Sequence, residues 1–227
     1  MSRLRADQPP LIRRLAAEGV GSFFLFATVI GSGIMAEGLS GGNVAVALLA
    51  NSLATGAILF VLITMLGPIS GAHMNPAVSL VAASRCELAW ADAAIYIAAQ
   101  LACGILGAWA AHLMFDLPLL QISEKSRTGG GQWLGEAIAT FGLILTILGT
   151  VRHRPLWVPA SVALYITAAY WFTSSTSFAN PAITVARSLS DTFAGISPYD
   201  VPLFIVAQLV GAALAALTAK WLFPPSV

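Results

Sequence analysis

The sequence predicts an all-α membrane protein with six transmembrane helices and two re-entrant half-helices, arranged as an inverted repeat. Three observations favour this fold class. The 227 residues are 58% hydrophobic and 9% charged, with a mean hydropathy of +0.83, whereas about a quarter of the residues are charged in soluble domains. Six apolar stretches are long enough to cross a bilayer. An Asn-Pro-Ala motif occurs twice outside these stretches.

The six spans are expected, in order, at about 12–35, 44–66, 88–114, 133–151, 156–173 and 201–223. The first Asn-Pro-Ala motif lies between the second and third spans, and the other lies between the fifth and sixth. About ten helical residues reach only about 15 Å into a hydrocarbon core about 30 Å thick. We therefore expect each motif segment to dip into the membrane and return.

The distribution of Lys and Arg predicts the orientation, because short cytoplasmic loops are enriched in these residues. With both termini in the cytoplasm, eight basic residues fall inside: Arg3, Arg5, Arg13, Arg14, Arg85, Arg152, Arg154 and Lys220. Three fall outside: Lys125, Arg127 and Arg187. A cleaved signal peptide is the alternative for the basic N-terminus, but Glu18 in the first apolar run and five further spans favour a retained helix. The sequence thus predicts a multi-pass protein of the inner (plasma) membrane.

The chain reads as a tandem duplication, because three landmarks recur in the same order. Glu18 pairs with Glu136, one Asn-Pro-Ala motif pairs with the other, and Gln100 pairs with Gln208. We expect one domain over residues 1–227, with a first repeat at 1–115, a connecting outer loop at 116–130 and a second repeat at 131–227. No site is assigned to the connecting loop. Each repeat holds three spans, an odd number, so the second repeat enters the membrane inverted.

Both motifs read as helix starts, because Asn is a favoured N-cap and Pro is favoured at the first helical position. Two short helices would begin at Pro76 and Pro181, with their N-termini facing each other near the bilayer centre. Irregular backbone at that depth is tolerated where it lines a watery cavity, so the loops before the motifs could form a ladder of carbonyl acceptors. The residues expected in this ladder are Gly71, Ala72, His73, Ser177 and Phe178.

The electrostatics of this centre favour the passage of small, neutral, hydroxylated molecules. Each helix N-terminus carries roughly half a positive charge, which disfavours cations and opposes a proton-carrying chain of waters. The side-chain amides of Asn75 and Asn180 can donate to a passing oxygen atom.

On these residues the chain resembles the aquaporins, or major intrinsic proteins, over essentially its whole length. The resemblance rests on the two motifs, on the stretch SGAHMNPAVS around the first one, and on the paired Glu and Gln residues. It implies a right-handed bundle of six helices with two half-helices, one pore per subunit, a homotetramer and passive conduction without a cofactor. The motif residues implied at the pore are Asn75, Pro76, Ala77, Asn180, Pro181 and Ala182.

The outer selectivity filter that the resemblance implies departs from the family's usual pattern. An Arg usually follows the second motif directly, but Ile183 stands there in this chain. Counting back from the two motifs gives Thr55, Ala168 and Ser177 at the other three positions. None of the four is charged, so we expect a wide, moderately apolar constriction. A similar aliphatic replacement occurs in bacterial, aquaglyceroporin-like members that are associated with trivalent arsenic hydroxides, polyols and other neutral metalloid acids.

Arg187 could substitute for the missing arginine. It lies four residues after Ile183, hence on the same helix face and about 6 Å nearer the outside. Two other interpretations stay open: an ion pair with Asp191, or a cation close to the helix C-terminus and the lipid headgroups.

Glu18 and Glu136 are carboxylates within apolar spans, where an ionisable residue is a functional candidate by default, for example in a proton relay. The alternative is that each carboxylate accepts hydrogen bonds from the re-entrant backbone of its own repeat and supports the loop. His73 likewise reads either as a pH sensor or as a tether within its turn.

The sequence gives no indication of an enzyme, because no plausible pair of nucleophile and base occurs and no Gly-rich phosphate loop precedes a helix. Cys86 and Cys103 lack the spacing of metal ligands. We expect no cofactor, no metal and no nucleic-acid partner. The leading function is a passive channel for water and small uncharged solutes that excludes ions and protons. The alternatives are an ion- or proton-coupled secondary transporter, a water-only channel and a membrane protein with a closed pore.

Overall fold

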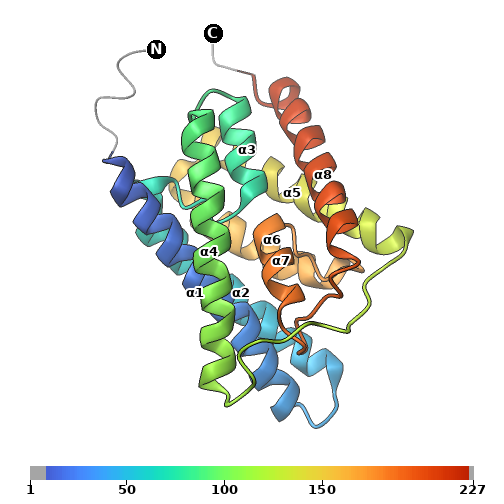
Figure 1. The fold of residues 1–227 in the computed structure, drawn as a ribbon. Coiled ribbons are helices and arrows are strands. Elements are labelled where there is room, and N and C mark those ends of the chain that lie inside the picture. The colour runs from blue at the N-terminus through green and yellow to red at the C-terminus, as the bar shows by residue number, and fades with distance from the viewer. Residues whose placement is uncertain (1–8, 225–227) are drawn as a thin grey trace.

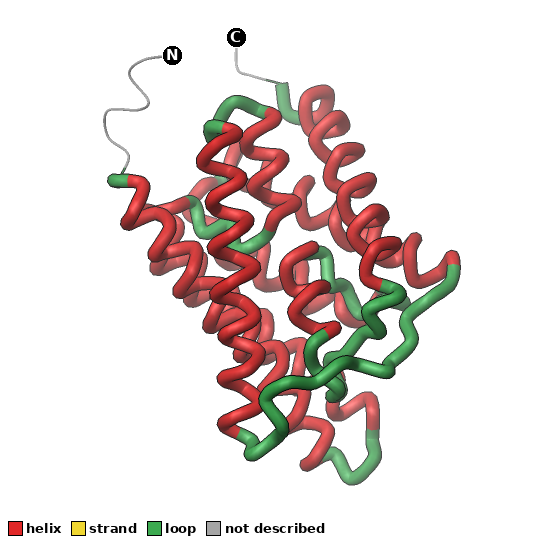
Figure 2. Tube along the Cα trace, in the orientation of Figure 1, coloured by secondary structure: helices red, strands yellow, loops and turns green. Residues whose placement is uncertain are grey.

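The computed structural model describes residues 9–224, and within that range it is a bundle of helices without a β-strand (Figures 1 and 2). The basic residues Arg3 and Arg5, used above for the orientation, lie outside the described residues. The elements are α1 (Leu11–Leu39), α2 (Val44–Ser70), α3 (Pro76–Ser84), α4 (Trp90–Met114), α5 (Gly130–His153), the 3-10 helix η2 (Pro155–Trp157), α6 (Val158–Phe172), α7 (Pro181–Ser188) and α8 (Val201–Leu222).

The six-span architecture predicted from the sequence is confirmed. Helices α1, α2, α4, α5 and α8 are long and apolar enough to cross a membrane. The remaining span is α6, which has 15 residues and follows the three-residue helix η2. Pro155 begins η2 and Pro159 lies in the first turn of α6, where a missing N–H is tolerated. The span expected at 156–173 is therefore a helix that is interrupted near its start.

The two halves of the bundle pack in the same way. Helix α1 packs against α2 and α4, helix α5 packs against α6 and α8, and α2 contacts α6 across the halves. A Cβ atom added at Gly107 of α4 would lie 2.1 Å from the Phe23 carbonyl oxygen of α1. One added at Gly211 of α8 would lie 2.2 Å from the Ala137 carbonyl oxygen of α5. Each half therefore needs a glycine where its two long helices cross, as is common for membrane helices.

The half-helices α3 and α7 lie inside the bundle and contact each other. Figure 1 shows the start of α1 and the end of α8 at the same face of the molecule, with α3 nearer to that face than α7. The segment 116–130 crosses the opposite face as a long loop (Figure 2). We call the face with the chain ends the inner face and the face under this loop the outer face.

Candidate functional site

The two half-helices begin with the same kind of cap. The side-chain oxygen of the Asn accepts a hydrogen bond from the backbone N–H two residues later, at 2.9 Å for Asn75 and 3.0 Å for Asn180. Pro76 and Pro181 are the first residues of α3 and α7. The local structure thus follows from the Asn-Pro pair itself, a capping residue followed by a residue that suits the first helical position.

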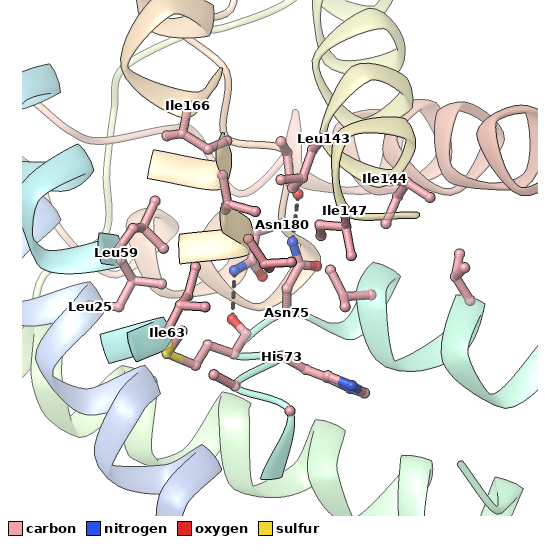
Figure 3. Close-up of a pocket in the computed structure, with 18 of the residues that line it drawn as sticks. Leu25, Leu59, Ile63, His73, Asn75, Leu143, Ile144, Ile147, Ile166 and Asn180 are labelled. Carbon is pink, nitrogen blue, oxygen red and sulfur yellow. Dashed lines mark hydrogen bonds between the residues drawn. The ribbon is translucent and has the colours of Figure 1, made fainter. Parts of the chain in front are cut away.

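The two caps are tied to one another near the centre of the molecule. The Asn75 amide nitrogen donates to the Ala179 carbonyl oxygen at 2.8 Å, and the Asn180 amide nitrogen donates to the Met74 carbonyl oxygen at 2.8 Å (Figure 3). Each amide group has two N–H donors, and the tie uses one of them. Both Asn side chains line a cavity, so the second donor of each is available to a molecule inside it.

Glu18 on α1 holds the first re-entrant loop. Its carboxylate accepts hydrogen bonds from the backbone N–H groups of His73 and Met74 at 2.8 and 2.7 Å. The Ser70 hydroxyl and the Gln100 amide donate to it at 2.7 and 2.8 Å. Glu18 is fully buried, so these four donors take the place of water around the charge.

Glu136 on α5 holds the second re-entrant loop in the same manner. Its carboxylate accepts from the backbone N–H groups of Phe178 and Ala179 at 2.8 and 2.9 Å, and from the amide of Gln208. Glu136 is fully buried as well. Because these donors are N–H groups that do not release protons near neutral pH, the geometry favours loop support over a proton relay.

Both loops keep a strained backbone that these carboxylates hold in place. The φ angle is +49° at Ala72 and +47° at Met74 in the first loop, and +51° at Ser177 and +48° at Ala179 in the second. A non-glycine residue in this left-handed region costs of order 1–3 kcal/mol and persists only where its surroundings fix it. All five residues expected in the carbonyl ladder line the cavity.

The cavity has a volume of about 510 Å³ and is lined by residues from both faces of the bundle. Its wall is mostly aliphatic, as Figure 3 shows for Leu25, Leu59, Ile63, Leu143, Ile147 and Ile166. The two Asn amides and the two loops add polar groups to this wall. Such a path presents hydrogen-bond partners and apolar surface to the same molecule, which suits a solute that carries both hydroxyl groups and carbon.

Three of the four residues expected in the outer filter line the cavity, and one does not. The three are Thr55, Ser177 and Ile183. The expectation for Ala168 needs correction, because this residue is exposed on the outside of α6 and Tyr170 lines the cavity in its place. Tyr170 lies four residues after Ile166 and shares its helix face, whereas Ala168 is two residues from each and faces away. Counting back from the motif misplaced the last turn of α6.

A hydrogen bond joins α2 to α6 beside the outer end of the cavity. The Thr55 Oγ1 atom lies 3.2 Å from the Tyr170 hydroxyl oxygen, and both side chains are buried. An aromatic ring with a hydroxyl group thus occupies the place where the sequence predicted a methyl group. The outer end of the cavity therefore carries an aromatic ring and a hydroxyl group that the sequence did not predict there.

Arg187 turns back toward the cavity, which it lines, and only 2% of its surface is exposed. Its Nε atom donates to the Ala194 carbonyl oxygen, and its guanidinium carbon lies 3.4 Å from the centroid of the Phe178 ring. The Asp191 carboxylate instead accepts the backbone N–H of Glu124 at 3.1 Å. Of the interpretations that the sequence left open, this geometry favours the one in which Arg187 takes the place of the missing arginine.

Arg127, in the connecting segment, is a residue that the sequence reasoning missed. Its Nε atom donates to the Gly195 carbonyl oxygen at 2.8 Å and its Nη1 atom to the Ser175 carbonyl oxygen at 3.3 Å. Its guanidinium carbon lies 5.0 Å from the centroid of the Phe178 ring. Burial lowers the pKa of Arg127 to about 10, against the opposing effect of the Glu136 charge, so the side chain stays protonated at neutral pH. In the sequence, the feature that could have pointed to Arg127 was its positive charge in a loop predicted to lie outside.

The inner end of the cavity carries charges of both signs. Arg85, Glu87 and Arg152 line it, and the Arg85 Nε atom lies 2.9 Å from a Glu87 carboxylate oxygen. His73 lies deeper, with its Nδ1 atom 3.1 Å from the Ser79 hydroxyl oxygen. This contact within the first repeat favours the tether interpretation of His73.

The comparisons with known proteins agree with this geometry. The family described as "Major intrinsic protein" matches residues 5–173. The chain is 56% identical to "Aquaglyceroporin AqpS" of Rhizobium meliloti, over 95% of this chain and 92% of that protein. It is 34% identical to "Aquaporin AqpM" of Methanothermobacter thermautotrophicus, over 93% of this chain and 98% of that protein. Among solved structures, the aquaglyceroporin from Plasmodium falciparum has the same fold, with a TM-score of 0.70 and 23% identity over 95% of this chain and 98% of that chain.

Proposed function

The chain belongs to the major intrinsic protein (aquaporin) family and is a passive membrane channel for water and small solutes rather than an enzyme, and from this premise we propose its permeants and the residues that select them. The proposed permeants are glycerol-like polyols and neutral metalloid hydroxides such as arsenite, together with water. The observation that carries this proposal is the amphipathic cavity, in which two Asn amides face an aliphatic wall.

The proposed centre of the pore consists of the two motifs. Asn75 and Asn180 donate to the oxygen of a passing molecule, while Pro76, Ala77, Pro181 and Ala182 fix the two helix starts. A water molecule that accepts from both amides has its lone pairs occupied, so it cannot accept a proton from its neighbour. The positive ends of α3 and α7 add a barrier to cations. Both effects support the exclusion of protons and ions.

The proposed outer filter consists of Thr55, Tyr170, Ser177 and Ile183, with Arg187 as its charged member. Ile183 leaves the space after the second motif apolar, which suits the carbon skeleton of a polyol. Arg187 enters from one turn farther along α7 and offers donors to hydroxyl groups. This filter is asymmetric, with an aliphatic and a polar part, as expected for solutes larger than water.

We further propose a homotetramer in the inner (plasma) membrane with both termini in the cytoplasm. The shared face of the first and last helices and the excess of Arg and Lys at that face support this orientation. Membership in the family supports the tetramer.

Stopped-flow light scattering of proteoliposomes tests the permeants. Vesicles are challenged in turn with sucrose, glycerol, urea and arsenous acid, and protein-free vesicles serve as the control. We expect fast water efflux under sucrose, followed by re-swelling with glycerol and with arsenous acid at rates well above the control. Fast water movement without glycerol entry would instead identify a water-only channel. Solute accumulation driven by a pH gradient would identify a coupled transporter.

A further inference from the structure

Three basic side chains gather at the outer mouth of the cavity: Lys125, Arg127 and Arg187. The two arginines lie against one aromatic ring, that of Phe178, with their guanidinium carbons 5.0 and 3.4 Å from its centroid. The Lys125 ammonium lies 4.9 Å from the centroid of the Phe193 ring. Burial lowers the pKa of Lys125, the charges of Arg127 and Arg187 lower it further, and the charges of Glu37 and Asp191 oppose this shift.

No carboxylate forms an ion pair with these three groups within residues 9–224. The ion pairs formed in that range, Arg14–Asp92 and Arg85–Glu87, lie elsewhere. The hydrogen bonds donated by the three side chains end on backbone carbonyl oxygens, those of Phe193, Ser175, Ala194 and Gly195. Two acidic residues of the outer loops accept hydrogen bonds from other donors. Asp200 accepts the backbone N–H of Arg127 at 2.7 Å, and Asp191 accepts that of Glu124 at 3.1 Å.

Polar atoms at the same place are buried and available. Arg187 uses its Nε atom for Ala194, which leaves the fork of its two Nη atoms toward the cavity that the residue lines. Ser177 lines the same cavity and is 2% exposed, and its buried hydroxyl has no hydrogen-bond partner among the described residues. Buried hydroxyl groups are rarely left without a partner. The site therefore offers an unused hydroxyl beside two guanidinium groups that form no ion pair with a carboxylate among the described residues.

We propose that the outer mouth is a binding site for a small monovalent oxyanion of the carboxylate or sulfonate type, and that the bound anion blocks the entry of neutral solutes from outside. Two oxygens of the anion take the Nη fork of Arg187, Arg127 supplies the second positive charge, and the Ser177 hydroxyl donates to the same anion. A guanidinium fork matches two oxygens on one centre, and the interaction is stronger where both partners are removed from water. The site closes the channel from one side, because the inner mouth already pairs Arg85 with Glu87.

The first experiment measures anion binding to the protein in detergent. Its result does not depend on which solutes the channel conducts. The purified protein in detergent is titrated with methanesulfonate, a monovalent oxyanion that stays ionised at working pH, while chloride replaces it at constant ionic strength. A ligand that binds the folded state raises the midpoint of thermal unfolding as its concentration exceeds Kd. We expect a rising midpoint for the wild type. We expect a much smaller rise for Arg187→Gln and Arg127→Gln, which lose the charge and keep a donor.

The flux arm rests on the proposed channel and uses proteoliposomes with methanesulfonate on both sides. Glycerol entry should slow as the anion is added, with half of the sites occupied at a concentration equal to Kd. Ser177→Ala and Arg127→Lys keep the positive charges at positions 127 and 187 but should still weaken the block. They test the site if a Gln variant does not fold. Lys220→Gln at the inner face removes a positive charge far from the site and should leave the block unchanged.

Three results would overturn the inference. One is a wild-type protein whose unfolding midpoint and glycerol flux respond to methanesulfonate and to chloride alike. Another is a block that survives in both Gln variants. The third is methanesulfonate entry at a rate similar to that of glycerol, which would show passage instead of block. Absent glycerol flux before any anion is added would count against the proposed permeants, while the thermal titration would still report on the anion site.

Discussion

Glu18 holds the loop at 71–75 at the inner half of the cavity, and Glu136 holds the loop at 173–180 at the outer half in the same way. In both halves a carboxylate accepts two consecutive backbone N–H groups and the amide of a Gln from the last long helix of the repeat. In both, positive φ angles fall at matching positions of the loop. The parts that hold the backbone are thus the same in the two halves.

The side chains around the two half-sites are different. The inner mouth carries the Arg85–Glu87 ion pair, whereas at the outer mouth no carboxylate of residues 9–224 binds the guanidinium group of Arg127 or Arg187. Arg127 comes from the connecting segment 116–130, which belongs to neither repeat. The duplication thus accounts for the scaffold, whereas residues outside the repeated pattern make the two mouths different, and we propose that those at the outer mouth decide which molecules enter.

The largest effect is expected when a carboxylate that holds a loop is removed. Glu18→Ala and Glu136→Ala each leave two buried backbone N–H groups without an acceptor, at about 1–3 kcal/mol for each group. Against a typical stability of 5–15 kcal/mol, this loss is severe. Both variants should give little monodisperse protein in size-exclusion chromatography and a strongly lowered thermal midpoint. If the halves are equivalent scaffolds, the two losses are similar in size.

Glu37→Ala is the matched control, since Glu37 lies on the same helix as Glu18 but is exposed. It should behave like the wild type. A folded, stable Glu18→Ala protein would contradict the assigned role of the carboxylate. A large difference between the two buried sites would show that the halves are less equivalent than their hydrogen bonds indicate.

A smaller loss is expected from Gly107→Ala and Gly211→Ala, again one in each half. The new Cβ atoms would lie 2.1 and 2.2 Å from backbone oxygens, so the helix pairs must move apart. Such overpacking typically costs about 1–3 kcal/mol. Gly38→Ala serves as the control, because a Cβ atom there has no neighbour within 4 Å among the residues that the structure describes. Thermal unfolding in detergent should rank the two crossing variants well below this control, and an unchanged midpoint for either would refute the close contact.

The scaffold could be predicted from the sequence because its signals are local and repeated. The length of the apolar stretches predicted the spans, and the Asn-Pro pair predicted the helix starts. The recurrence of Glu18 at Glu136 indicated the duplication, and three spans in each repeat predicted the inversion. Each of these depends on residue type and on order along the chain. The break before α6 was missed, since Pro155 and Pro159 act on the start of a helix whose hydropathy is continuous.

The outer mouth could not be predicted in full because it depends on contacts between distant segments. Tyr170 replaces Ala168 through the helical phase at the end of α6, which counting from Asn180 does not reveal. Arg127 reaches the mouth only because its loop crosses the outer face and binds Ser175 and Gly195. The sequence left three readings of Arg187 open for the same reason: the carbonyl group of Ala194 that fixes it comes from the next loop.

A substitution in the proposed outer filter should change the ratio of glycerol to water flux without unfolding the protein. Thr55→Phe places a ring at the outer constriction, and we expect glycerol flux to fall on the order of tenfold more than water flux, equivalent to about 1.4 kcal/mol. Ala168→Phe is the matched control, since that position is exposed on α6 and should leave the ratio of the two fluxes unchanged. Stopped-flow light scattering measures both. If Ala168→Phe changes the ratio of glycerol to water flux as much as Thr55→Phe does, Ala168 belongs to the filter, as the sequence predicted.

The smallest effects compare one polar contact from each end of the cavity. Tyr170→Phe removes the hydroxyl group 3.2 Å from Thr55, at about 0.5–1.5 kcal/mol of stability, and widens the outer constriction slightly. We expect the ratio of glycerol to water flux to rise about twofold, which corresponds to only about 0.4 kcal/mol. Glu87→Gln breaks the partly exposed Arg85 pair at the inner end, at less than about 1 kcal/mol, and should not alter this ratio. Because selectivity is assigned to the outer half alone, a shift in the ratio caused by Glu87→Gln would show that the inner mouth also discriminates between solutes.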